Sequence, residues 1–200
     1  PGGARKKFFR SYNCIDVDLF KTSESRRNPF AGRNLPGKKI LFVGRIDERK
    51  GVPQLLEAYK LLTEKDPNTT LLMVGEGPLE EMVREYKRDF SLEHLHLEGW
   101  QDPLTVAQYY HHCDLFVLIS VKDPNPLVVF EALAAGIPIL FTDKAGNAME
   151  FVEDDANGYV VDPLDIPDIV QKAGMMLDWD DAKRNRVKKV CDKKIMLANY

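Results

Sequence analysis

The chain gathers positive charge in segment 44–51, directly after a short apolar run at 40–43. Arg45, Arg49 and Lys50 lie in this segment, and residues with helical spacing follow it. Cations beside the amino end of a helix favour a bound anion such as phosphate, because charged side chains and unpaired amides act together. The segment lacks the second glycine and the Ser or Thr that a P-loop requires. A solvent-exposed basic loop is the alternative interpretation.

Two acids form a second candidate for chemistry. Asp123 and Glu131 have seven residues between them and flank the start of a predicted helix. Pro126 suits the first helical turn, where no amide donor is needed, and the amides of Leu127 and Val128 are then available to an anion. In the alternative interpretation, Asp123 is a turn or capping acid and Glu131 is the partner of a buried donor.

Segment 75–78, Gly-Glu-Gly-Pro, is a third loop that follows an apolar run. A dinucleotide fingerprint needs a further glycine where Glu80 stands, which argues against a nicotinamide or flavin dehydrogenase. The simplest interpretation is a tight turn in which Pro78 starts a helix. Four histidines in two pairs complete no metal-binding motif, so no metal site is expected.

These loops need a scaffold that brings them together. Short apolar runs alternate along the chain with longer stretches of helical periodicity. Continuous apolar runs indicate strands buried on both faces, and strands separated by helices imply right-handed crossovers in a parallel sheet. The sequence therefore predicts an α/β fold, a Rossmann-like doubly wound parallel sheet whose ligands lie beyond the carboxyl ends of the strands. The predicted strands are 40–43, 71–74, 95–97, 115–119, 139–141 and 159–161, and the predicted helices are 55–62, 79–86, 106–110, 127–135, 166–177 and 182–196.

The chain divides into three predicted parts. Residues 1–38 form an irregular lead-in, residues 39–178 the Rossmann-like domain, and residues 179–200 a C-terminal helical extension. The last helix is basic, and its apolar side is small, which favours a solvated face over contact with a membrane surface. Trp100 and the pair Tyr109-Tyr110 are interpreted as core or edge packing rather than as base-stacking platforms. A contact with a nucleotide base stays open for Trp100, because it lies in the loop that follows a predicted strand.

Composition limits the classes of function. With 200 residues, of which 44% are hydrophobic, the chain is long enough for one α/β domain with its own core. A formal net charge of −3 gives no bulk positive field for nucleic acid. No apolar run approaches the ~20 residues that span a bilayer. Cys14, Cys113 and Cys191 lie far apart and form no CxxC motif, which fits a reducing cytoplasm.

Six segments together resemble the retaining GT-B glycosyltransferases of the GT4 family, also called glycosyl transferases group 1. Asp123 and Glu131 resemble the family's pair of acids, and the residues after Glu131 resemble its EAxAxGxP continuation. The matches occur in the family's order. The other four segments are Asn13 to Phe20, Gly44-Arg45 with Lys50-Gly51, Gly75-Glu76-Gly77-Pro78, and Asn157-Gly158.

The resemblance implies the C-terminal, nucleotide-sugar-binding half of such an enzyme. Arg45 and Lys50 are then expected to hold the donor diphosphate, helped by the amides of Leu127 and Val128. Negative charge builds on the leaving diphosphate, and fixed donors stabilise it more in the transition state than in the ground state. The implied reaction transfers a sugar from a nucleotide sugar, of the UDP or GDP type, with retention of anomeric configuration. It needs no obligatory metal and no other cofactor.

The resemblance also gives roles to the two acids. Glu131 is expected to accept hydrogen bonds from the ribose hydroxyls, and Asp123, the candidate catalytic residue, to face the donor sugar. Asp123 stands where the family usually has Glu, which is one methylene longer. Cys14 replaces a usual Gly, and Ala145-Gly146 replaces a usual Gly-Gly.

An acceptor-binding domain is expected to precede the present residues, so the chain alone should bind nucleotide and transfer no sugar. Neither the sugar nor the acceptor follows from the sequence. A lipid acceptor would give the basic last helix a membrane surface to contact. Two alternatives stay open: a non-catalytic nucleotide-binding domain, and a nucleotide-sugar epimerase or phosphorylase of the GT-B fold.

Overall fold

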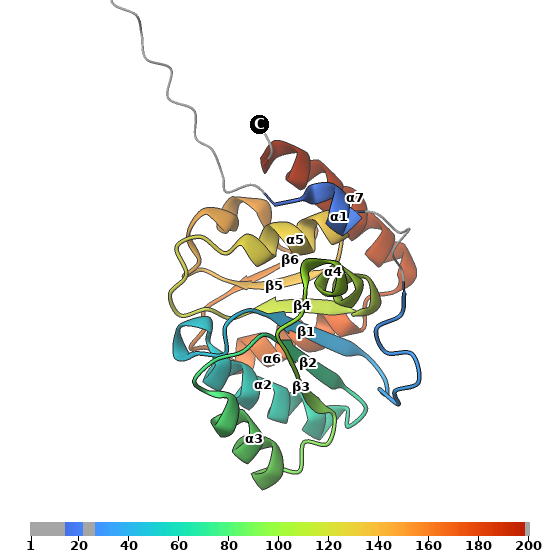
Figure 1. Ribbon diagram of the computed structural model, residues 1–200. Coiled ribbons are helices and arrows are strands. Elements are labelled where there is room, and N and C mark those ends of the chain that lie inside the picture. Colours follow the sequence, from blue (N-terminus) through green and yellow to red (C-terminus); the bar gives the residue numbers. More distant parts are fainter. Residues whose placement is uncertain (1–14, 22–26, 199–200) are drawn as a thin grey trace, which may run out of the picture.

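The computed structural model describes residues 15–21 and 27–198, and its centre is a six-stranded parallel sheet (Figure 1). The strand order is β3-β2-β1-β4-β5-β6, so the direction of the winding reverses between β1 and β4. This order confirms the predicted Rossmann-like doubly wound fold, in which ligands bind at the reversal point. The strands are β1 (Lys39–Val43), β2 (Thr70–Val74), β3 (Leu95–Gly99), β4 (Leu115–Leu118), β5 (Ile139–Thr142) and β6 (Gly158–Val161).

Helices cover both faces of the sheet (Figure 1). On one face lie α2, α3 and α6, and on the other lie α1, α4, α5 and α7. Two 3-10 helices, η2 (Glu48–Lys50) and η3 (Gly146–Phe151), follow β1 and β5. The α-helices are α1 (Val17–Lys21), α2 (Val52–Lys65), α3 (Glu80–Asp89), α4 (Pro103–His112), α5 (Leu127–Ala135), α6 (Ile166–Leu177) and α7 (Asp181–Ala198).

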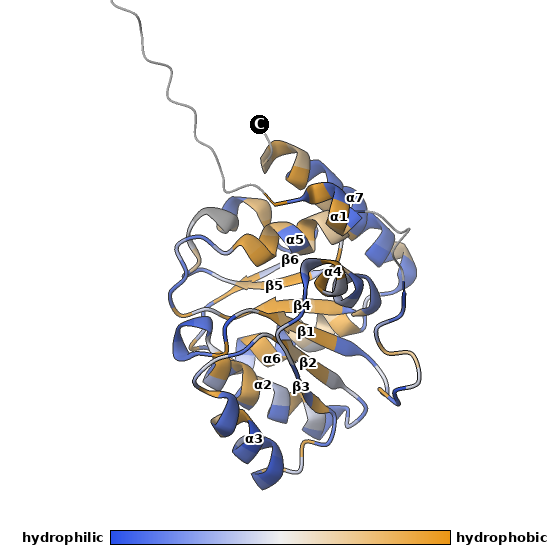
Figure 2. Ribbon diagram, viewed as in Figure 1, coloured by the Kyte–Doolittle hydropathy of each residue, from blue (hydrophilic) through white to orange (hydrophobic). Residues whose placement is uncertain are grey.

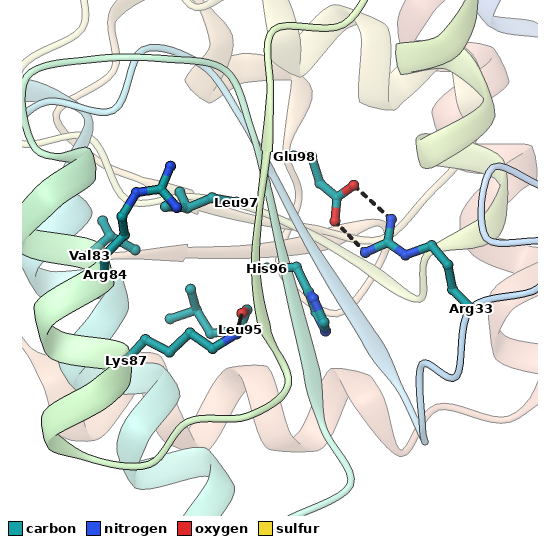
Figure 3. A pocket seen from close by; sticks show the side chains of 8 residues that line it. All are labelled: Arg33, Val83, Arg84, Lys87, Leu95, His96, Leu97 and Glu98. Carbon is teal, nitrogen blue, oxygen red and sulfur yellow. Dashed lines mark hydrogen bonds and ion pairs between the residues drawn. The ribbon is translucent and has the colours of Figure 1, made fainter.

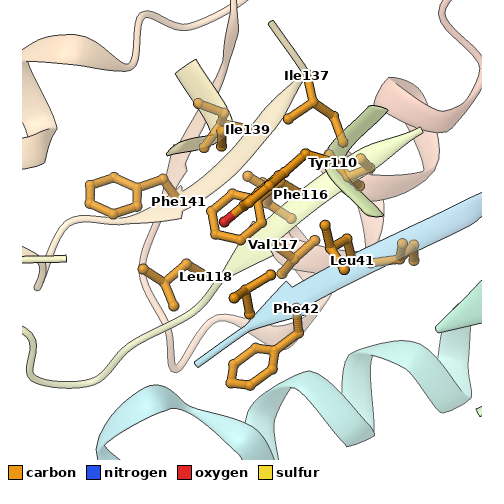
Figure 4. Close-up of a cluster of buried hydrophobic side chains, with 14 of the residues drawn as sticks. Leu41, Phe42, Tyr110, Phe116, Val117, Leu118, Ile137, Ile139 and Phe141 are labelled. Carbon is orange, nitrogen blue, oxygen red and sulfur yellow. The ribbon is translucent and has the colours of Figure 1, made fainter. Parts of the chain in front are cut away.

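Apolar side chains fill the space between the sheet and both helical layers, while the outer helix faces are polar (Figure 2). Phe42, Phe116 and Phe141 come from three different strands and are fully buried, and Tyr110 of α4 packs against Phe116 with ring centroids 5.4 Å apart (Figure 4). Burying one side chain of this size contributes about 1.5–3 kcal/mol. The core therefore holds the strands rigidly, and the loops at their carboxyl ends start from fixed positions.

All the predicted strands and helices are present, with ends shifted by a few residues. The prediction that Pro78 starts a helix is wrong, because α3 begins at Glu80. The loop continues past Pro78 since the Leu79 N–H donates to the carbonyl of Ile46 in a neighbouring loop at 3.1 Å. Pro126 likewise lies just outside α5, as its N-cap residue.

The lead-in was predicted to be irregular, but it contains the short helix α1. Phe20 on α1 packs edge-on against Tyr110, with ring centroids 5.9 Å apart, and the Asp16 carboxylate accepts the Leu19 N–H at 3.1 Å. A five-residue helix has too little propensity to form alone, so packing and this cap stabilise it. Asn13 and Cys14, the first two residues of the segment 13–20 that resembles the family, lie outside the described residues.

The C-terminal helix α7 packs against α5 and buries Val187, Cys191 and Ile195. The Arg184 guanidinium donates to the carbonyl of Asp114 at 2.7 Å, which ties α7 to the start of β4. Three of its five lysines, Lys188, Lys189 and Lys193, are exposed, which fits the expected solvated face. The division of the chain at residues 38 and 178 stays a prediction.

Candidate functional site

The loops that follow β1, β2 and β4 meet beyond the carboxyl ends of their strands. The Ile46 N–H donates to the Glu76 carbonyl at 3.0 Å and ties the β1 loop to the β2 loop. The Val121 N–H donates to the Arg49 carbonyl at 2.9 Å and ties the β4 loop to the β1 loop. These backbone bonds fix the three sequence-predicted loops against one another near the reversal point of the sheet.

Two glycines permit this close packing. A Cβ on Gly51 would lie 1.7 Å from the Ile119 carbonyl oxygen, and the φ of Gly51 is +71°. A Cβ on Gly77 would lie 2.3 Å from the Ile46 carbonyl oxygen. A side chain at either position would push two loops apart, which explains why glycine stands there.

One carboxylate organises the cations of the β1 loop. Asp47 is buried, and its Oδ1 accepts the Lys50 N–H at 3.0 Å, which caps η2. Its Oδ2 lies 3.2 Å from Arg49 Nη2 and 3.5 Å from Arg45 Nε. Both arginine side chains are about two-thirds exposed, so their charges remain open to an anion from solvent. Sequence reasoning missed Asp47, although an acid within three positions of all three cations was the available signal.

Lys50 and Asp123 form an ion pair between the β1 and β4 loops. Their side chains are 18% and 10% exposed, so the pair lies largely beneath the surface. An ammonium group carries three donors, and the contact with Asp123 leaves the others for a ligand. The Asn125 N–H also approaches Asp123 Oδ1 at 3.4 Å, a weak contact of the kind that the turn interpretation expected.

The first turn of α5 presents backbone amides a few residues after Asp123. Among the described residues, no hydrogen bond uses the N–H of Leu127 or Val128. The Val129 N–H bonds back to the Pro126 carbonyl at 3.2 Å, and no side chain caps the helix. Unpaired amides at a helix amino end, together with the helix dipole, make a site that attracts anions.

Glu131 lies one turn further along α5 and contacts a buried tyrosine. The Tyr110 hydroxyl is 3.2 Å from Glu131 Oε2 and 3.1 Å from the Val128 carbonyl oxygen. Burial raises the pKa of the Glu131 carboxyl, and the Tyr110 hydrogen bond opposes that rise. Burial also raises the pKa of Tyr110 well above its ordinary value. The structure thus supplies the buried donor that the structural interpretation of Glu131 required, and sequence reasoning had assigned Tyr110 to packing alone.

Residues 25–191 match the sequence model of a protein family described as Glycosyl transferases group 1. The chain belongs to the glycosyl transferases group 1 family. It is 31% identical over 183 residues to spore coat protein SA of Bacillus subtilis (strain 168), an alignment that covers 82% of this chain and 47% of that protein. The chain therefore spans about half the length of the curated relatives it matches.

Solved structures agree with this family membership. The C-terminal domain of a glycosyl transferase group 1 family protein from Francisella tularensis is 25% identical, with a TM-score of 0.78, and covers 92% of this chain and 97% of that one. A second similar structure, an Anabaena protein in complex with UDP and glucose, has a TM-score of 0.77 at 23% identity and covers 94% of this chain and 54% of that one. The fold is that of the C-terminal half of a GT-B glycosyltransferase, as the sequence predicted.

A pocket of about 360 Å³ lies away from the predicted site of this group 1 family member, beside the edge strand β3 (Figure 3). Its charged side chains already have partners within the protein, whereas Nε2 of His96 is buried without a hydrogen-bond partner among the described residues. Arg33 forms two hydrogen bonds of 2.7 Å with Glu98, and the Lys87 ammonium donates to the Leu95 carbonyl at 2.7 Å. The sequence-predicted cations Arg45 and Lys50 lie instead at the carboxyl edge of the sheet, where the Arg45 side chain is about two-thirds exposed.

Aromatic residues near β3 follow the prediction only in part. Tyr109 and Tyr110 are buried, as expected. Trp100 is 68% exposed, so its assignment to core or edge packing is wrong. Gly99, which directly precedes Trp100 at the end of β3, has a positive φ of +67°.

Within residues 15–21 and 27–198, no three or more His, Cys, Asp or Glu side chains are grouped so as to hold a metal ion. The helices of the same residues include none that is both long and apolar enough to span a membrane.

Proposed function

We propose that this chain binds a nucleotide-sugar donor at the carboxyl edge of its sheet and serves a retaining, GT4-type sugar transfer. The observation that supports the proposal is the convergence of two loops and one helix start. Arg45 and Lys50 come from the β1 loop, Asp123 from the β4 loop, and the free amides of Leu127 and Val128 from α5.

In the proposed complex the two cations and the α5 amides hold the diphosphate. As the bond between the sugar and the diphosphate breaks, negative charge grows on the leaving group, and these donors stabilise it without rearranging. Fixed cations perform the neutralisation for which other transferases use a divalent metal, so we propose that no metal and no further cofactor is required. Glu131 then accepts hydrogen bonds from the ribose.

Asp123 faces the donor sugar in this proposal while keeping its contact with Lys50. The shared ammonium would hold the shorter Asp side chain in place, in the position where related enzymes carry Glu. UDP is the first nucleotide to test because the similar Anabaena structure is a complex with UDP and glucose. We propose the cytoplasm as the compartment, because the widely spaced cysteines fit a reducing environment.

The nucleotide site is tested by calorimetric titration of UDP and GDP into the wild-type chain and the Arg45→Ala and Lys50→Ala variants. Each substitution removes a charge-assisted contact and should weaken binding by about 1.5–3 kcal/mol. Arg88→Ala, which removes an exposed arginine from α3, is the matched control and should leave the affinity unchanged. Unchanged affinity in the Arg45→Ala/Lys50→Ala double variant contradicts the assignment.

Sugar transfer is proposed to require a preceding acceptor-binding domain, as in two-domain relatives. Holding acceptor and donor in line supplies roughly 7–11 kcal/mol of barrier reduction in favourable cases, and this chain alone would lack that alignment. Incubating the chain with a panel of nucleotide sugars and acceptors should therefore give no glycosylated product. Rapid turnover by the chain alone would refute this half-enzyme proposal.

A non-catalytic nucleotide-binding role is the second candidate, and the shorter acid at position 123 favours it. The protein joined to its preceding domain would distinguish the two. If Asp123→Glu gains transfer activity that the wild type lacks, the natural chain is a binding domain. If the wild type transfers sugar and Asp123→Asn loses transfer while keeping UDP affinity, it is an enzyme.

A further inference from the structure

Tyr110 connects two parts of α5 that the proposed function uses separately. Its hydroxyl is 3.1 Å from the carbonyl of Val128, in the first turn, and 3.2 Å from Oε2 of Glu131. Val128 contributes a free amide to the anion site, and Glu131 is the proposed ribose acceptor. The same hydroxyl therefore lies against both the diphosphate end and the ribose end of the proposed nucleotide site.

The ring of Tyr110 has little freedom to move. It is 1% exposed and packs against Phe116 of β4 and Phe20 of α1, with ring centroids 5.4 and 5.9 Å apart (Figure 4). A ring fixed on three elements places its oxygen with little loss of entropy when a ligand binds. This is the arrangement expected of a side chain that orients a binding group.

The chemistry of the hydroxyl allows only one donated bond at a time. Glu131 in its ionised form is the stronger acceptor, so the proton points to Oε2. Among the described residues, no hydrogen bond reaches Oε1 of Glu131. Tyr110 thereby holds one carboxylate oxygen and leaves the other to accept from a ligand hydroxyl.

We infer that Tyr110 is a positioning residue for the nucleoside, because its hydroxyl orients Glu131 toward the ribose. This inference rests on the proposed function and deepens it. It predicts that the hydroxyl of Tyr110 matters for ligands that carry a ribose and not for a bare diphosphate.

The ionisable groups around Glu131 make this prediction testable by pH. Burial raises the pKa of Glu131, and the Tyr110 hydroxyl lowers it. The other elements packed on α5 carry further ionisable groups: Asp18 and Lys21 on α1, His111 and His112 on α4, and the arginine and lysine side chains of α7. Tyr110→Phe removes the donor that stabilises the ionised form of Glu131 and leaves the ionisable groups on α1, α4 and α7 unchanged.

The experiment compares Tyr110→Phe with Tyr109→Phe in the full 200-residue chain. Both changes remove one buried hydroxyl that contacts a carboxylate, but Tyr109 contacts Glu98 at the far edge of the sheet, at 2.6 Å. Affinities for UDP and for inorganic pyrophosphate are measured by calorimetry over a range of pH. Tyr110→Phe should weaken UDP about three- to tenfold at neutral pH and leave pyrophosphate unchanged, and Tyr109→Phe should change neither.

The pH profile adds a readout that mere loosening of the core would not move. UDP affinity relative to pyrophosphate should fall as the pH drops through the Glu131 pKa, and Tyr110→Phe should move that fall to higher pH. In a Glu131→Gln background the same substitution should add no further loss, because the pair acts as a unit.

Equal UDP affinity in Tyr110→Phe and wild type, or equal losses for UDP and pyrophosphate, overturns the inference and leaves the proposed function standing. A wild-type chain that binds neither probe overturns the proposed function itself. Measuring both probes on both variants keeps these two failures apart.

Discussion

In both the β1 loop and the region beside strand β3, arginine lies next to an acidic side chain. The two regions differ in how fully the acid neutralises the arginine charge and in how exposed that charge remains. At the β3 edge, Arg33 and Glu98 form a two-point pair at 2.7 Å that Tyr109 completes. In the β1 loop, Asp47 is shared between Arg45 and Arg49 at longer distances, and both guanidinium groups face solvent. The first arrangement stabilises the protein, whereas the second leaves positive charge available to a ligand.

The pKa of the buried acids shows the same contrast. Burial acts to raise the pKa of Glu98, but the hydrogen bonds from Arg33 and Tyr109 outweigh it, and the pKa is lowered. For Glu131, burial wins over the single bond from Tyr110, and the pKa is raised. An acid that the protein has fully paired supports the fold, and an acid left partly unpaired is kept at a cost that a ligand can offset.

The largest expected effect comes from adding a methyl group to one glycine in each of the two regions. Gly51→Ala places a methyl group against the Ile119 carbonyl and should lower the free energy of unfolding by at least ~3 kcal/mol. Gly99→Ala is the matched control, because its φ is also positive but its Cβ would meet open space. That change should cost only about 1–2 kcal/mol from backbone strain. Urea unfolding of both variants measures the difference, and equal losses would show that the loops do not need their close approach.

The next largest effects are expected from replacing one arginine in each region and measuring both stability and UDP affinity. Arg33→Ala leaves Glu98 without its two-point partner and should cost about 1–2 kcal/mol of stability, with UDP affinity unchanged. Arg45→Ala should change stability by less than about 0.5 kcal/mol and weaken UDP instead. Thermal unfolding and calorimetry on the same samples test both.

The stability loss expected in Arg33→Ala depends on pH in a defined direction. The Glu98 pKa is lowered in the fold, so its stabilising contribution is complete above the ordinary value of 4.5 and is lost as the pH falls through the lowered value. Arg33→Ala should therefore be as stable as wild type in strong acid and less stable near neutrality. A constant difference across this range contradicts the assignment of Glu98.

The smallest effect should come from neutralising the acids themselves. The Glu131 pKa is raised, so the proton favours the fold below 4.5, and that contribution is lost as the pH rises through the raised value. Glu131→Gln should therefore keep or raise stability at neutral pH by about 0.5–1 kcal/mol while it weakens UDP. Glu98→Gln should lower stability and leave UDP binding unchanged. A large thermal loss in Glu131→Gln with normal UDP affinity would favour the structural interpretation of that acid.

Much of the fold follows from local pattern. Continuous apolar runs identified the strands, and the ends of α5 at Leu127 and Ala135 were predicted to the residue. The convergence of the loops that carry Lys50 and Asp123 was predicted from topology, because neighbouring parallel strands end at the same edge, but their ion pair was not. These features depend on periodicity and on connection rules that a sequence displays directly.

Other features depend on the final packing and left no local signal. The contact between Tyr110 and Glu131 exists because α4 lies against α5, which no spacing within either segment reveals. The role of Asp47 depends on the dihedral angles of η2, and α1 forms only against α4 and α5. Trp100 was misassigned because a large aromatic side chain predicts burial more often than the exposure seen here.

The pair of Lys50 and Asp123 joins residues 73 positions apart, on strands that the chain completes at different times. A site split in this way exists only after β4 has docked beside β1, a non-local and therefore slow step of folding. A nucleotide sugar bound to both the β1 loop and the β4 loop would stabilise their contact. Each tenfold rise in its concentration above the dissociation constant would add about 1.4 kcal/mol to the free energy of unfolding. The supply of donor would thus set how long the chain survives unfolding and proteolysis.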